Sequence, residues 1–177
     1  MYHSLAKYRL VYSYLMAVMA IACAGRHPIY WGLILCVAGM AVRFWAAGNI
    51  RKNDEVSKSG PYAFTRNPLY LGSFLGALGA FVLGRELVPT IIFVVTFAIF
   101  YGSTIRSEED WLSGHYKEDY AEYKRNVPVF LPRLTPYKSG SASSFSWAQA
   151  LSNKEHKYSS TTVLVPILVL IVGYLKH

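Results

Sequence analysis

Residues suited to chemistry gather in two short polar motifs, each of which adjoins an apolar segment. The first motif, residues 59–72, reads SGPYAFTRNPLYLG. Gly60-Pro61 predicts a turn, and Asn67-Pro68 predicts a helix N-cap followed by proline at the first helical position. Backbone N–H groups without helical partners at such a start are suited to bind an anion. A simple loop that enters a helix would read similarly, so both interpretations stay open at this point.

The second motif, residues 107–132, reads SEEDWLSGHYKEDYAEYKRNVPVFLP. It opens with Glu108 and Glu109 directly after an apolar run, where acids are costly unless they are solvated, paired or bound to a cation. Apolar residues then recur at helical spacing, which predicts an amphipathic helix that continues the apolar run and lies along the lipid headgroups. This apolar face consists of Leu112, Tyr116, Tyr120 and Tyr123. Val127-Pro128 is expected to end the helix.

Together the two motifs offer the contacts that one particular kind of ligand needs. Carboxylates suit a ribose diol or an ammonium group, and an arginine with helix N–H groups suits a carboxylate. The rings of Tyr62 and Tyr70 suit an adenine or a sulfonium. S-adenosyl-L-methionine carries all of these groups, although a nucleotide would satisfy several of the same contacts.

Composition predicts an all-α, multi-pass transmembrane helical bundle. The chain has 177 residues, of which 53% are hydrophobic and 16% are charged, whereas a soluble domain carries about 25% charged residues. Apolar runs separated by short basic loops are typical of membrane proteins. Five spans are expected, at Leu10–Gly25, Ile29–Gly48, Leu69–Gly84, Leu87–Ile105 and Thr161–Leu175.

The net charge of +8 is better explained by topology than by nucleic acid. Most Lys and Arg residues fall in the N-terminus and in two loops, residues 49–67 and 106–160, which the five spans place on one side. The positive-inside rule makes that side cytoplasmic, with the N-terminus inside and the C-terminus outside. The basic side also suits anionic membrane lipids, and no pattern of an RNA-binding module is present. We expect a bacterial inner membrane rather than the endoplasmic reticulum.

The remaining patterns concern packing. Gly72, Gly76, Ala80 and Gly84 form a stripe that lets membrane helices approach closely, and we expect this packing to hold residues 67–70 beside the end of the fourth span. Cys23 and Cys36, the two cysteines, lie in apolar runs, so no disulfide is expected, and no metal-ligand spacing is found. We predict a single domain over residues 1–177, with a cofactor-binding core at 49–134 and a connector with the last span at 135–177.

The two motifs resemble the signature of the isoprenylcysteine carboxyl methyltransferase family, and phospholipid N-methyltransferases share parts of it. The resemblance covers about residues 51–132 and rests on GPY, RNPLYLG and the later EE…L…Y…Y…VP…LP in this order. It implies an integral membrane enzyme that uses S-adenosyl-L-methionine on a lipid-like or prenylated acceptor.

The resemblance and the local chemistry together imply a set of site residues. The expected cofactor-binding residues are Asp54, Glu55, Val56, Ser57, Tyr62, Arg66, Asn67, Pro68, Leu69, Tyr70 and Glu108. Arg106 and Glu109 are the expected catalytic residues, and Arg43, a charge inside the second span, is expected to contact the substrate.

The chain departs from the family pattern at two places. Asn67 stands where the family usually has histidine, and asparagine cannot carry a proton. Arg106 is out of register with the family arginine that precedes the glutamate pair by about one helical turn. The alternatives are therefore a phospholipid N-methyltransferase, a sterol-reductase-type enzyme, or a non-catalytic membrane module with the same fold.

Overall fold

The computed structural model describes residues 8–50, 56–138, 144–153 and 155–176. This part of the chain is helical and contains no strand, which confirms the all-α prediction. The α-helices are α2 (Arg9–Ala22), α3 (Trp31–Asn49), α4 (Pro68–Gly84), α5 (Leu87–Asn126), α6 (Trp147–Ser152) and α7 (Glu155–Leu175). One 3₁₀ turn, η1, spans Gly60–Ala63.

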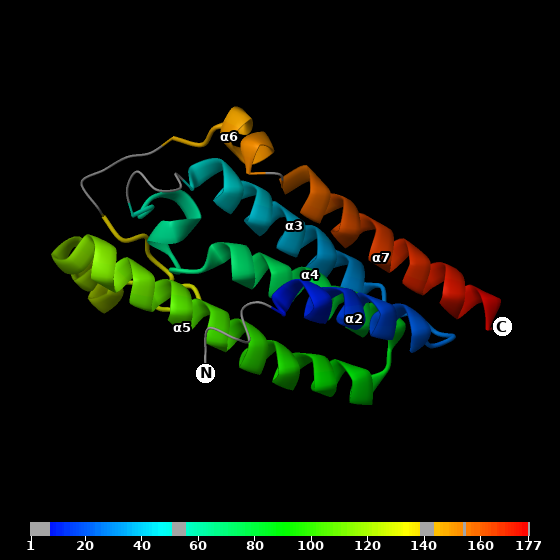
Figure 1. The fold of residues 1–177 in the computed structure, drawn as a ribbon. Coiled ribbons are helices and arrows are strands. Elements are labelled where there is room, and N and C mark those ends of the chain that lie inside the picture. Colours follow the sequence, from blue (N-terminus) through cyan, green and yellow to red (C-terminus); the bar gives the residue numbers. More distant parts are fainter. Residues whose placement is uncertain (1–7, 51–55, 139–143, 154, 177) are drawn as a thin grey trace.

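Each of the five predicted apolar segments coincides with a helix. By length and apolar character, α3 and α5 could cross a bilayer, whereas the apolar helices at Val11–Ala22, Pro68–Gly84 and Ser160–Leu175 are shorter. In Figure 1 the η1 loop, the last part of α5 and α6 gather at one end of the bundle, and the C-terminus lies at the other. The predicted sidedness requires this arrangement, while the crossing of all five segments remains a prediction.

The small-residue stripe brings α4 against α3. A Cβ atom on Gly39 would lie 2.4 Å from the Gly76 backbone nitrogen, and one on Gly79 would lie 2.5 Å from the Gly32 carbonyl oxygen. The backbones of the two helices are therefore in contact, as small residues allow in membrane proteins.

Aromatic rings on the neighbouring face of α4 pack against α5 instead. Phe74 stacks on Phe93 with ring centroids 5.8 Å apart, and Phe81 stacks on Phe93 at 4.9 Å. The stripe thus attaches α4 to α3, and large side chains separate α4 from α5.

A leucine at Gly39 is expected to destabilise the protein, because the neighbouring backbone of α4 occupies the space that its side chain needs. We expect a loss of about 1–3 kcal/mol or more, the usual cost of overpacking, measured by thermal unfolding in detergent. Gly114→Leu is the matched control, since a Cβ atom at Gly114 meets no atom within 4 Å. Equal melting temperatures for the two variants would contradict the close approach.

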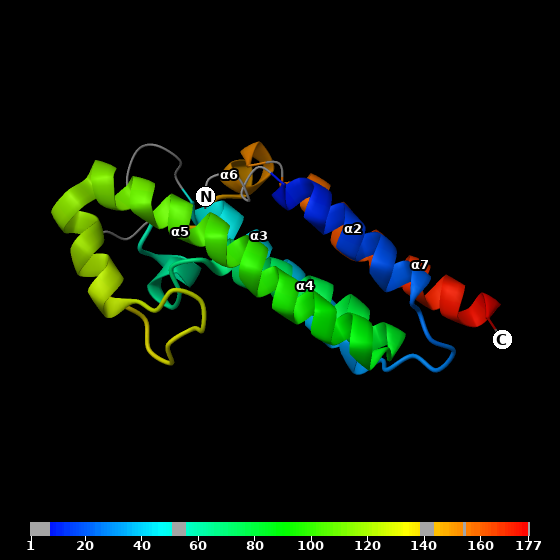
Figure 2. The ribbon, with the colours of Figure 1, turned by 60° about the horizontal axis from the view of Figure 1, so that its bottom comes forward.

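Helix α5 continues well past its apolar part, as predicted, but it is not straight. Lys117 has φ 34° and ψ −108°, which is not helical, and the residues that follow turn back toward the bundle (Figure 2). The helix ends at Asn126 with Val127 as its C-cap, which confirms the predicted end at Val127-Pro128. The break at Lys117 corrects the expectation of one continuous amphipathic helix.

The predicted apolar face of this segment is confirmed. Tyr120, Tyr123 and Val127 are buried together with Val56. Leu112 and Tyr116 pack against the same cluster and are partly buried. This cluster holds the end of α5 against the chain that leads into η1.

Candidate functional site

Hydrogen bonds join the first motif to the end of α5 and to the segment that follows it. The backbone bonds run from Arg66 N to Pro128 O, from Arg133 N to Phe64 O and from Tyr137 N to Ala63 O, each 2.9 Å long. Side chains add Thr65 Oγ1 to Phe130 O (3.0 Å) and Tyr123 Oη to Tyr62 O (2.7 Å). Two segments that are about 60–75 residues apart in the sequence therefore form one unit at the end of the bundle.

The side chain of Asn67 also joins these two segments, although it was expected to cap α4. It occupies the N-cap position of α4, and Pro68 is the first helical residue, as predicted. Its side chain makes no capping hydrogen bond, however, and Nδ2 donates to the carbonyl oxygen of Val129 at 2.9 Å. The polar side chain thus connects the two motifs instead of capping the helix.

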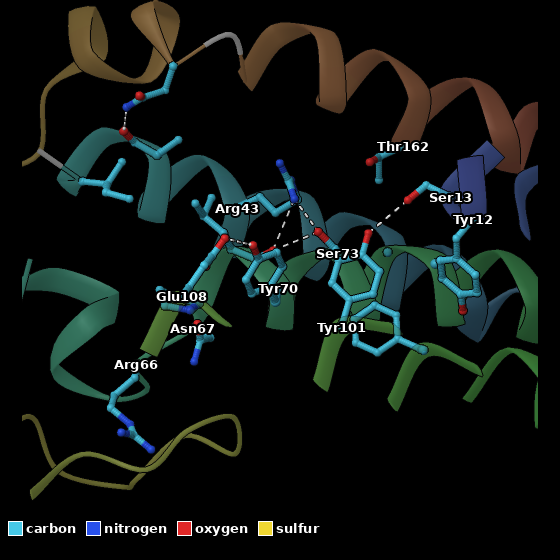
Figure 3. Close-up of a pocket in the computed structure, with 18 of the residues that line it drawn as sticks. Tyr12, Ser13, Arg43, Arg66, Asn67, Tyr70, Ser73, Tyr101, Glu108 and Thr162 are labelled. Carbon is cyan, nitrogen blue, oxygen red and sulfur yellow. Dashed lines mark hydrogen bonds between the residues drawn. The ribbon is translucent and has the colours of Figure 1, made fainter. Parts of the chain in front are cut away.

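The two motifs meet at Tyr70 and Glu108. Tyr70, in the first turn of α4, donates its hydroxyl hydrogen to Glu108 Oε1 on α5, with an O···O distance of 2.6 Å (Figure 3). A bond this short is typical of a hydroxyl that donates to a carboxylate. The ring of Tyr70 also contacts Tyr101 edge to face, with centroids 5.3 Å apart.

A cavity of about 800 Å³ opens beside this pair, within the range of about 300–1,000 Å³ that is usual for ligand sites. Its polar end is lined by Arg43, Tyr62, Asn67, Tyr70 and Glu108. From there it extends between α2, α4, α5 and α7, where its lining is mainly apolar. This apolar arm includes Met16, Ala20, Ala77, Ala80, Phe93 and Val165.

Arg43 reaches the polar end of the cavity from α3. Its Nη1 donates to Ser73 Oγ and, at 3.3 Å, to the carbonyl oxygen of Leu69 (Figure 3). A charged side chain inside an apolar helix needs partners of this kind. The cation is therefore anchored against the first turns of α4, at the border between the polar end and the apolar arm.

Tyr62 presents a buried hydroxyl at the polar end. Within the described residues, its oxygen has no hydrogen-bond partner, although it is inaccessible to solvent. Burial raises the pKa of Tyr62 well above its ordinary value, and the neighbouring Tyr123 and Glu108 raise it further. Tyr62 therefore stays neutral and is able to donate or accept a hydrogen bond to a bound molecule.

Glu109 lies beside the cavity but is held by two cations. Its Oε1 is 3.1 Å from Arg66 Nη1, and its Oε2 is 3.3 Å from Lys124 Nζ. Among the residues that the structure describes, neither Arg66 Nη1 nor Glu109 Oε1 has a hydrogen-bond partner, so their contact is a charge pair. The carboxylate thus ties the residue before the N-cap of α4 to the end of α5, and its expected catalytic role stays a prediction.

The structure does not bring Arg106 to this cavity. Its exposed side chain lines a second cavity of about 520 Å³, and Arg66, Glu109, Phe97 and Tyr101 contribute to the walls of both. Because α5 turns by about 100° per residue, Arg106 and Glu108 point to different sides of the helix.

Most of the expected cofactor-binding residues do come together. The cavity is lined by Val56, Ser57, Tyr62, Arg66, Asn67, Pro68, Leu69, Tyr70 and Glu108. Asp54 and Glu55 lie outside the described residues. In the part of the chain that the structure covers, no group of three or more His, Cys, Asp or Glu side chains is arranged to hold a metal ion.

Two residues that line the cavity, Tyr101 and Ser13, were not predicted from the sequence. The Tyr101 and Ser13 hydroxyl oxygens are 3.0 Å apart and join α5 to α2 (Figure 3). Phe93, Phe97 and Tyr101 recur every four residues on α5, a signal that predicts one aromatic face. Ser13 gave no such signal, because a lone serine in an apolar helix has no periodic pattern.

The buried tyrosines predict a loss of stability at alkaline pH. Burial, and secondarily the charge of Glu109, raises the pKa of Tyr120 from 10.0 to about 12. The folded protein therefore holds this proton more tightly than the unfolded chain, so the stabilisation is complete below pH 10 and is lost as the pH rises toward 12. Thermal unfolding in detergent over this pH range should show the fall, and Tyr120→Phe should reduce it. A wild-type melting temperature that stays constant across the range would contradict this account.

Comparison with known proteins adds a family resemblance. The family model described as phospholipid methyltransferase matches residues 40–119. The chain is 28% identical to the cobalt-zinc-cadmium resistance protein CzcN of Cupriavidus metallidurans, over 97% of this chain and 82% of that protein. It is 37% identical to the nickel-cobalt-cadmium resistance protein NccN of Alcaligenes xylosoxydans xylosoxydans, over 56% of this chain and 47% of that protein.

A further relative is a named methyltransferase. The chain is 30% identical to protein-S-isoprenylcysteine O-methyltransferase of Schizosaccharomyces pombe, over 55% of this chain and 41% of that protein. The chain thus spans less than half of the length of this enzyme and of NccN. No solved structure matches the chain.

The helical fold and these relatives make the chain similar to membrane proteins of the methyltransferase type. More particularly, the chain resembles the phospholipid methyltransferases and the protein-S-isoprenylcysteine O-methyltransferases, which confirms the resemblance predicted from the two motifs.

Proposed function

We propose that the chain is an S-adenosyl-L-methionine-dependent methyltransferase that acts on a lipid-like acceptor at the cytoplasmic face of the membrane. The observation that supports this most directly is the cavity, because it joins a polar end made by both motifs to an apolar arm inside the bundle. A polar cofactor and an apolar acceptor would each find a matching surface there.

The residues at the polar end fit this cofactor. Glu108 offers a carboxylate to the ribose hydroxyls, and the rings of Tyr62 and Tyr70 offer faces to the adenine or the sulfonium. The buried hydroxyl of Tyr62 has an unused hydrogen-bonding capacity. When bound, the cofactor supplies an electrophilic methyl group on sulfur.

The chain itself has mainly to position the two molecules and exclude water. Orientation of reacting groups is worth about 7–11 kcal/mol in favourable cases. Arg43, at the border of the polar end and the apolar arm, is placed to hold an anionic group of the acceptor. A carboxylate acceptor needs no deprotonation, which favours an isoprenylcysteine-type O-methylation, whereas the matching family model favours N-methylation of a phospholipid.

The test is a methyl-transfer assay with the purified full-length chain in nanodiscs. Methyl-labelled S-adenosyl-L-methionine is added together with a total bacterial lipid extract, and the labelled lipid is identified. Label that base releases indicates an ester, and label on a headgroup amine indicates N-methylation. Cofactor binding without transfer to any lipid would favour a non-catalytic module, and absence of binding would overturn the proposal.

A further inference from the structure

The segment that follows α5, residues 128–137, carries two leucines whose side chains point away from the protein. Leu131 is 75% exposed and Leu134 is 99% exposed. The segment forms neither helix nor strand, and it returns to the start of α4 after the break in α5 (Figure 2). What surrounds the two leucines therefore follows from the level at which the segment meets the bundle.

Phe130 marks the level of the first part of this segment, next to Leu131. Its ring contacts Phe74 edge to face with centroids 5.7 Å apart, and its centroid is 6.3 Å from that of Phe97. Phe74 lies in the second turn of α4, six residues beyond Pro68, which is roughly 9 Å at about 1.5 Å per residue. Phe97 lies in the apolar part of α5. The segment thus reaches the level at which both helices are apolar.

The second cavity places the segment at the same level. Val129 and Phe130 line this space of about 520 Å³ together with Val94 and Ala98 of α5. Val94 is 39% exposed and Ala98 is also exposed, so this side of α5 faces hydrocarbon in a bilayer. The second cavity is distinct from the cavity of about 800 Å³ described above, which we call the main cavity.

Phe64 marks the level of Leu134. The backbone N–H of Arg133 donates to the Phe64 carbonyl oxygen at 2.9 Å, and the ring of Phe64 lies 6.1 Å from that of Trp45. Trp45 stands four residues before the end of α3, and tryptophan is enriched where membrane helices meet the headgroups. Leu134 therefore lies near the headgroup boundary, less deep than Leu131.

We infer that residues 128–134 form an anchor loop, which enters the bilayer from the side on which the polar end of the main cavity lies. Leu131 contacts hydrocarbon, and Leu134 contacts the boundary between hydrocarbon and headgroups. Burial of apolar side chains in this region is what attaches interfacial segments to membranes. The inference rests on the membrane location of the bundle and requires neither cofactor nor methyl transfer.

The hydrogen bonds of the anchor loop suit this depth, because backbone that is not helical needs partners inside a membrane. The carbonyl oxygens of Pro128, Val129 and Phe130 accept from the Arg66 backbone, the Asn67 side chain and the Thr65 side chain. Proline, present at residues 128 and 132, has no N–H that would need a partner. Since Arg66 and Asn67 line the main cavity, the anchor loop fixes the depth of its polar end in the membrane.

The test measures the depth of nitroxide spin labels on the full-length chain in nanodiscs, without cofactor. Single cysteines are introduced in a Cys23→Ser, Cys36→Ala background. A label at Leu131→Cys should collide with oxygen, which concentrates in hydrocarbon, and should lose most of the effect of a water-soluble nickel chelate. Leu134→Cys should give an intermediate depth.

Two exposed positions on α5 are the matched controls. Val95 is 53% exposed in the apolar part of the helix, so Val95→Cys should report hydrocarbon. Glu118 is exposed and lies beyond the apolar part, just after the break at Lys117, so Glu118→Cys should report water.

A nickel effect at Leu131→Cys as large as that at Glu118→Cys would overturn the inference. So would a label shielded from both oxygen and nickel, because a protein partner or a second copy would then cover the loop. If Leu131→Cys lowers the melting temperature, Leu134→Cys decides, and a depth equal to that of Glu118→Cys overturns the inference. None of these outcomes bears on methyl transfer, which the lipid-labelling assay tests separately.

Discussion

Replacement of Glu108 by glutamine is expected to weaken S-adenosyl-L-methionine binding by about 10- to 100-fold. Glutamine keeps the size of the side chain but removes the charge, and a hydrogen bond to a charged group is worth about 1.5–3 kcal/mol. The 2.6 Å bond from the Tyr70 hydroxyl to the carboxylate is also replaced by a weaker bond to a neutral amide oxygen. Binding of labelled cofactor to the purified protein measures the effect.

Asp110→Asn is the matched control for this prediction. Asp110 is an exposed acid two residues further along α5 and does not line the main cavity, so its variant should bind the cofactor like the wild type. Tyr70→Phe should give a smaller loss, because the carboxylate remains. Wild-type affinity in Glu108→Gln would remove Glu108 from the proposed site.

A phenylalanine at Ala77 is expected to reduce methyl transfer by about 100-fold while cofactor binding stays near the wild-type level. Ala77 lines the apolar arm away from the polar end, and a large ring there would displace the acceptor. A misplacement of about 1 Å already costs about 100-fold in rate. The assay compares the transfer rate with cofactor affinity in the same preparation.

Ala41→Phe serves as the control, because Ala41 is exposed on α3 and does not line either cavity. It should leave both quantities unchanged. Equal loss of cofactor binding and transfer in Ala77→Phe would mean that the apolar arm does not hold the acceptor separately.

The sequence predicted the helices well because their signals are local. Long apolar runs, Pro68 at a helix start and Val127-Pro128 at a helix end each act within a few residues. The break at Lys117 carries no such signal, since neither proline nor glycine stands there. It depends on the contacts that Tyr120 and Tyr123 make with distant residues.

The approach of the two motifs was predictable, whereas the direction of individual side chains was not. Tyr70 and Glu108 meet as the topology required. The Asn67 side chain donates a hydrogen bond to Val129 instead of capping α4, and the Glu109 carboxylate pairs with Arg66 and Lys124. The partner of each side chain depends on which distant residues the fold brings close to it.

The unbroken course of α5 before Lys117 limits the size of any acceptor. Phe93 and Glu108 both line the main cavity and lie on one helix, 15 residues apart, which corresponds to roughly 22 Å at about 1.5 Å per residue. Since a helix does not stretch, this distance between Glu108 at the reacting end and Phe93 in the apolar arm is fixed. If the proposed function holds, acceptors with an apolar tail much longer than this distance should be poor substrates. The part of the tail that does not fit in the cavity has to leave the bundle or fold back.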